Sequence, residues 1–150
     1  MTNQDVIQLY ENYQKHYPTK LNLDEFVTLL TFFPAIQVLI ADGEIDQEEW
    51  MYVQHISKSM ADTYKDEMPN KYELIDLQQT YETELAYILA NISNWSAKFT
   101  FGLKSYLKEM PEVREIVFDV MYMFADASND ISKAEKDMIE NLKQELELGG

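Results

Sequence analysis

Residues 26–41 contain no charged side chain, and this run constrains the fold more than any other part of the sequence. A helix over these residues would be about 24 Å long, which is shorter than the roughly 30 Å hydrocarbon core of a membrane. The run also contains threonine, proline and glutamine. We therefore expect the central buried helix of a folded domain, with a membrane-inserted segment as the less favoured alternative. Because Pro34 has no N–H group to donate to the carbonyl of Leu30, we expect a kink or a short break there.

Apolar residues elsewhere recur at spacings of three and four, which indicates helices. No stretch alternates apolar and polar residues between hairpin turns, and the chain has only 4 Gly and 4 Pro. The sequence predicts an all-α single domain over residues 1–150, a bundle of about seven helices. The helices are expected at about 3–16, 22–41, 46–62, 71–92, 93–110, 111–124 and 132–146. In the third of them, the apolar stripe consists of Trp50, Val53, Ile56 and Met60. Ser93 or Asn94 is the expected cap of the fifth.

The charge and composition exclude several classes of protein. The 150 residues carry a formal net charge of −15, which should repel nucleic acids and anionic membranes. With no cysteine there is no disulfide, thiolate nucleophile or cysteine-based metal site. The first residues show no secretory signal pattern, so we expect a cytoplasmic protein with no membrane span.

Two acidic stretches resemble each other and form an internal repeat. Residues 38–49 and 122–135 each contain an apolar helix end, then Ala-Asp, a polar turn and an isoleucine. A capping residue follows the isoleucine, with a glutamate three positions on, which is the pattern of a capping box. The chain thus contains two copies of a unit that consists of a helix, an acidic turn and a second helix. The repeat predicts a pseudo-symmetric bundle with its two turns near each other.

This repeat resembles the TerB-like family of tellurite-resistance proteins. Residues 41–49 (Ala-Asp-Gly-Glu-Ile-Asp-Gln-Glu-Glu) carry most of the resemblance, and residues 125–135 are similar to a second, degenerate copy that lacks the glycine. The resemblance covers roughly residues 23–142. It implies an all-helical protein in stress or tellurite-resistance processes, whose clustered carboxylates form a divalent-cation site.

The acidic turns are the candidate metal site. Several carboxylates lie close together there, and no Lys or Arg lies between Leu21 and Ser57 to compensate them. Oxygen ligands suit Ca²⁺, Mg²⁺ or Mn²⁺, and such an ion would relieve the repulsion between the carboxylates. The candidate ligands are Asp42, Glu44, Asp46, Glu49, Asp126, Asp130 and Glu135.

A structural role for these residues is the alternative. Acidic residues at helix starts are also favoured by capping and by the helix dipole, so the turns would then belong to a protein–protein interaction module without metal. Neither turn fits an EF-hand, because Ile131 stands where the glycine is needed in one and Val53 where the final acid is needed in the other. No phosphate loop, nucleophile elbow or zinc-protease motif occurs. We expect a non-enzymatic protein with a protein partner.

Overall fold

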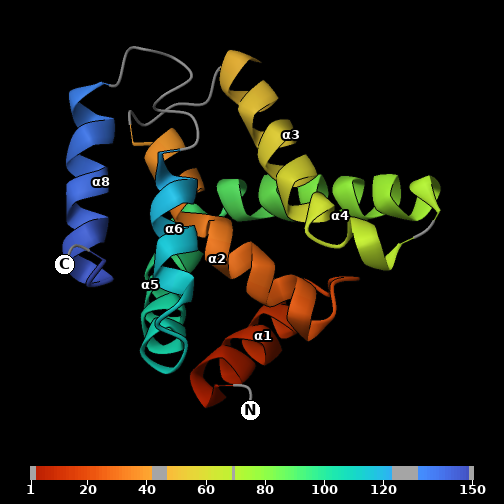
Figure 1. The fold of residues 1–150 in the computed structure, drawn as a ribbon, viewed down its shortest axis with the longest axis horizontal. Coiled ribbons are helices and arrows are strands. Elements are labelled where there is room, and N and C mark those ends of the chain that lie inside the picture. The colour runs from red at the N-terminus through yellow and green to blue at the C-terminus, as the bar shows by residue number, and fades with distance from the viewer. Residues whose placement is uncertain (1–2, 42–46, 69, 123–131, 149–150) are drawn as a thin grey trace.

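In the computed structural model, which describes residues 3–41, 47–68, 70–122 and 132–148, the uncharged run forms most of helix α2 (Leu23–Leu39). The helix begins with a capping box, in which the Asn22 side chain accepts from the Glu25 N–H at 2.8 Å and the Glu25 carboxylate accepts from the Asn22 N–H at 2.9 Å. All residues from 29 to 39 are buried. Helix α2 contacts five other helices, as the prediction of a central buried helix requires (Figure 1).

Of the kink or short break expected at Pro34, the break does not occur, because α2 continues through Pro34 to Leu39. Proline removes only one backbone hydrogen bond, and the residues on both sides of it are buried in the core. Packing of this whole segment against neighbouring helices outweighs the local loss. A propensity argument alone overestimates the effect of a proline in such a position.

The other helices follow the predicted spacing. They are α1 (Gln4–His16), α3 (Gln47–Asp62), α4 (Lys71–Ala90), α5 (Ile92–Glu109), α6 (Val113–Met121), α8 (Lys133–Glu145) and the short 3₁₀ helix η1 (Lys65–Glu67). The part of the chain that the structure describes contains seven α-helices and no strand, which confirms the all-α bundle. None of the helices in this part combines the length and hydropathy that a membrane span requires.

Two further details of the sequence prediction are wrong. Trp50, placed on the apolar stripe of α3, is 40% exposed, although Val53, Ile56 and Met60 are buried as predicted. Helix α5 begins directly after Asn91 without a side-chain cap, rather than at Ser93 or Asn94. The Asn91 side chain instead donates to the carbonyl oxygen of Tyr87 in α4 at 2.9 Å, so the two helices share a tight junction.

Aromatic side chains from α1, α2, α4 and α5 meet in the middle of the bundle. The Tyr13 ring contacts the rings of Phe26, Tyr87, Trp95 and Phe99, with centroid distances between 5.2 and 6.0 Å. The Trp95 indole N–H donates to the Tyr87 hydroxyl at 3.0 Å. These contacts join helices that are far apart in the sequence.

Gly102 lets α1 approach α5 closely. A Cβ atom at this position would lie 2.8 Å from Cδ2 of Leu9 in α1. We expect Gly102→Val to lower the free energy of unfolding by about 1–3 kcal/mol, because the larger side chain overpacks this contact. Thermal unfolding measures the effect, at roughly 2–4 °C per kcal/mol for a chain of this size.

Gly102→Ala is the matched control. Its single methyl group crowds only the end of the Leu9 side chain and makes ordinary contact with Leu30, and alanine favours a helix over glycine by about 1 kcal/mol. The alanine variant should therefore unfold close to the wild-type temperature. Equal melting temperatures for the valine and alanine variants would show that the α1–α5 contact is not tightly packed.

Candidate functional site

The predicted cation ligands fall largely outside the described residues. Asp42, Glu44, Asp46, Asp126 and Asp130 all lie outside them, and so does the side chain of Glu49. Glu135 in α8 is the one candidate ligand whose side chain the structure describes. Within the described ranges, no group of three or more His, Cys, Asp or Glu side chains could hold a metal ion.

Glu135 takes part in a capping box at the start of α8. Its backbone N–H donates to the Ser132 hydroxyl at 3.1 Å, and the Ser132 N–H donates to Oε1 of Glu135 at 3.3 Å. This confirms the capping box predicted for the second repeat. Because one carboxylate oxygen is already used by the helix start, Glu135 has a structural role whether or not it also contacts an ion.

The helices on either side of the two acidic turns have a common arrangement. Helix α2 packs against α3, α6 and α8. In Figure 1 the C-terminal ends of α2 and α6 and the N-terminal ends of α3 and α8 all lie toward the top of the view. The helix ends that flank both turns therefore lie toward the same end of the bundle (Figure 1). The predicted closeness of the two turns concerns residues outside the described ranges.

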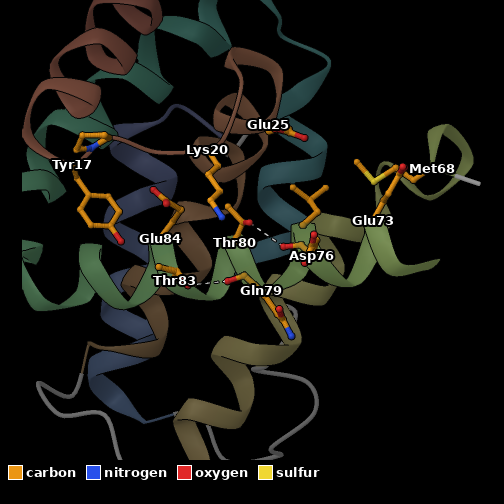
Figure 2. A pocket seen from close by; sticks show the side chains of 12 residues that line it. Tyr17, Lys20, Glu25, Met68, Glu73, Asp76, Gln79, Thr80, Thr83 and Glu84 are labelled. Carbon is orange, nitrogen blue, oxygen red and sulfur yellow. Dashed lines mark hydrogen bonds between the residues drawn. The ribbon is translucent and has the colours of Figure 1, made fainter. Parts of the chain in front are cut away.

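A separate cavity lies between α4 and the segment that connects α1 to α2 (Figure 2). Its volume is about 480 Å³. The α4 residues that line it recur at helical spacing and so share one face. The lining residues are Tyr17, Pro18, Lys20, Glu25, Met68, Glu73, Asp76, Leu77, Gln79, Thr80, Thr83 and Glu84.

Glu84 is the most unusual residue of this cavity, because it carries a carboxyl group and yet is only 3% exposed. The hydroxyl of Tyr13, which is itself fully buried, donates to Oε1 of Glu84 at 2.7 Å. No lysine, arginine or histidine of the described residues forms an ion pair with Glu84; the ion pairs there join Lys58 to Asp62 and Lys143 to Glu140. A buried carboxyl group without a cationic partner is costly, so its position calls for a reason.

The surroundings of Glu84 change its protonation. Burial raises the pKa of the Glu84 carboxyl group, while hydrogen bonds from the Tyr13 and Thr19 side chains act in the opposite direction. The same pairing raises the pKa of Tyr13, through burial first and the adjacent Glu84 second. The Tyr13 hydroxyl therefore remains a donor over the whole physiological range, and the carboxyl group is the group of this pair that titrates.

The sequence analysis did not identify Glu84, although the sequence contains a signal for it. Tyr81, Leu85 and Ile88 form the buried stripe of α4, and Glu84 stands among them at helical spacing. A carboxylate on an apolar face is rarely buried unless it has a partner. Its partner lies 71 residues away in α1, which spacing within one helix cannot reveal.

No family model matches this chain, and no curated protein or solved structure matches it significantly. The TerB-like resemblance therefore remains a prediction from the acidic repeat.

Proposed function

We propose that this chain is a non-enzymatic TerB-like domain that binds a divalent cation through its two acidic inter-helix turns. The observation that supports the proposal is the position of the helix ends that flank the two turns. Helix α2 contacts α3, α6 and α8, and the flanking ends of all four helices lie toward one end of the bundle (Figure 1). Carboxylates from both turns would then converge on one ion. The proposed ligands are Asp42, Glu44, Asp46, Glu49, Asp126, Asp130 and Glu135.

The chemistry of these side chains favours a hard cation. All of them are carboxylates, and the chain has no cysteine and only 2 His to offer softer ligands. Ca²⁺, Mg²⁺ and Mn²⁺ prefer oxygen ligands, and the net charge of −15 would attract any of them. By the same resemblance, the protein would act in stress or tellurite-resistance processes.

A second candidate is a protein–protein interaction module whose acidic turns are purely structural. The capping box of Ser132 and Glu135 favours it, because that carboxylate already stabilises a helix start. Large apolar side chains also lie exposed near the start of α3, with Met51 66% and Trp50 40% exposed. The two candidates make different predictions for metal binding.

Calorimetry and thermal unfolding of the metal-free protein test the cation proposal, with Ca²⁺, Mg²⁺, Mn²⁺ and Zn²⁺ as separate probes. We expect heat of binding for at least one of the first three ions. At 100 times the dissociation constant, binding should stabilise the fold by about 2.7 kcal/mol, which corresponds to roughly 5–11 °C. The absence of both heat and a melting shift at millimolar ion would overturn the proposal.

A pair of double variants locates the site. Asp42→Asn with Asp126→Asn should abolish the ion-dependent shift, because each turn then loses a charged ligand. The control is Glu11→Gln with Glu109→Gln, which changes the net charge equally at exposed positions of α1 and α5. An equal loss in both double variants would indicate a general charge effect and contradict a localised site.

A further inference from the structure

We propose that the cavity beside α4 binds a small linear polyamine, with the carboxylate of Glu84 anchoring one ammonium group. This site is separate from the acidic turns, because it is formed by α4 and the α1–α2 connection. Glu84 is a buried acidic side chain that lines the cavity, and no basic side chain of the described residues forms an ion pair with it. An ammonium group would supply that missing charge.

The geometry of Glu84 suits an anchor. Its Oε1 is held by the Tyr13 hydroxyl at 2.7 Å, which fixes the side chain in one orientation. Figure 2 shows Glu84 extending from α4 toward the opposite wall, where Tyr17 and Lys20 lie. A charge-assisted hydrogen bond from a ligand to this carboxylate would form in a partly dry environment, where such bonds are stronger than in water.

The rest of the lining fits a chain of methylene groups with further charges. Tyr17, Pro18, Met68 and Leu77 provide apolar surface between the polar groups. On α4, Asp76 lies eight residues before Glu84, which is about 12 Å along the helix at 1.5 Å per residue. A linear polyamine has the same alternation, because its ammonium groups are separated by hydrocarbon.

Metal binding explains this cavity less well. A chelated ion needs several carboxylates around one point. The described residues contain no group of three acidic or histidine side chains that could hold one. Acidic side chains spread along a helix face instead match a ligand whose positive charges are spread in the same way.

Lys20 provides an internal comparison. It is the one basic residue that lines the cavity, and in Figure 2 its side chain extends toward Thr80 of α4. The ammonium group of Lys20 would repel a bound polyamine and compete with it for the same carboxylates. Replacing Lys20 should therefore strengthen binding, which a merely structural cavity would not explain.

Isothermal titration at 0.15 M salt tests the proposal, with 1,4-diaminobutane, spermidine and spermine as probes. We expect saturable binding of at least one of them. Glu84→Gln should weaken it by about 10- to 100-fold, the usual effect of losing a hydrogen bond between charged groups. Asp76→Asn should weaken it severalfold, and Lys20→Gln should strengthen it severalfold.

Glu82→Gln is the matched control, because it removes the same charge from the same helix at a position that does not line the cavity. It should leave affinity within about twofold of wild type, since the half-buried Glu82 does not line the cavity and its charge is partly screened by solvent. Equal weakening by Glu82→Gln and Glu84→Gln, or no saturable binding of any probe, would overturn the proposal. If Glu84→Gln does not fold, the opposite effects of Asp76→Asn and Lys20→Gln decide it.

The same titration with the Asp42→Asn, Asp126→Asn double variant separates this site from the proposed cation site. We expect polyamine affinity to be unchanged in that variant, because the described residues that line the cavity come from other parts of the chain. A parallel loss of polyamine and metal binding would mean that one acidic region binds both, and would contradict a polyamine site at Glu84.

Discussion

Replacement of Phe99 by alanine is expected to lower the free energy of unfolding by about 3–5 kcal/mol. The Phe99 side chain is fully buried on α5. Its ring centroid lies 4.8 Å from that of Phe33, 5.6 Å from that of Phe26 and 6.0 Å from those of Tyr13 and Trp95. Truncation would leave a cavity where α1, α2 and α5 meet. The rings around it belong to different helices and cannot all move inward without disturbing one another.

Chemical denaturation and thermal unfolding measure this loss, and the melting temperature should fall by roughly 2–4 °C per kcal/mol. Phe101→Ala is the matched control, because Phe101 lies two residues away on the same helix and is 64% exposed. That variant should stay within about 0.5 kcal/mol of wild type. Similar losses in both variants would contradict the assignment of the aromatic cluster as the centre of the core.

The helices could be predicted from the sequence because their signals are local. The capping box of Ser132 and Glu135, which the second acidic stretch predicted, is present at the start of α8. In α8 and directly after it, the apolar residues Ile139, Leu142 and Leu146 recur at spacings of three and four, and all three are buried. Such features depend on residues three or four apart, so one sequence contains all the information they need.

The errors arise where the outcome depends on what lies opposite a helix. Spacing gives the face on which Trp50 lies, but it does not show how far the neighbouring helices extend to cover it. The continuity of α2 through Pro34 likewise depends on packing by helices distant in the sequence. Both errors come from tertiary contacts that override a local rule.

Of the two candidate sites, one is marked by a local sequence pattern and the other depends on segments that are distant in the sequence. The acidic repeat is a local pattern, and the helix ends that flank its two turns lie toward the same end of the bundle (Figure 1). The cavity beside α4 depends on the α1–α2 connection approaching a helix more than fifty residues later in the chain. No motif marks it. Only the unusual position of Glu84 on an apolar stripe indicates from sequence that α4 does more than pack.

Replacement of Tyr13 by phenylalanine is expected to lower the free energy of unfolding by about 1–3 kcal/mol at neutral pH. The variant keeps the aromatic ring but removes the hydroxyl that donates to Glu84. The buried carboxyl group then loses a donor that stabilises its charged form. Tyr72→Phe is the control, because the Tyr72 side chain is 68% exposed and its hydroxyl can be replaced by water.

The dependence on pH distinguishes this effect from simple loss of packing. Burial raises the pKa of Glu84 above its ordinary value, so the folded state keeps a proton that the unfolded chain has already released. The contribution of Glu84 to wild-type stability should therefore be greatest below the pKa that its carboxyl group has in the unfolded chain. It should fall as the pH rises through the higher pKa of the same group in the folded state. Glu84→Gln removes the titration and should remove this part of the pH dependence.

Tyr13→Phe should steepen the same dependence. The Tyr13 hydrogen bond lowers the pKa of Glu84, so its loss raises that pKa further and makes the ionised carboxylate more costly in the folded state. The destabilisation caused by Tyr13→Phe should thus be larger at pH 8 than at pH 4. In the background of Glu84→Gln it should be the same at both pH values. A penalty that does not change with pH in the wild-type background would show that Glu84 is not the group coupled to Tyr13.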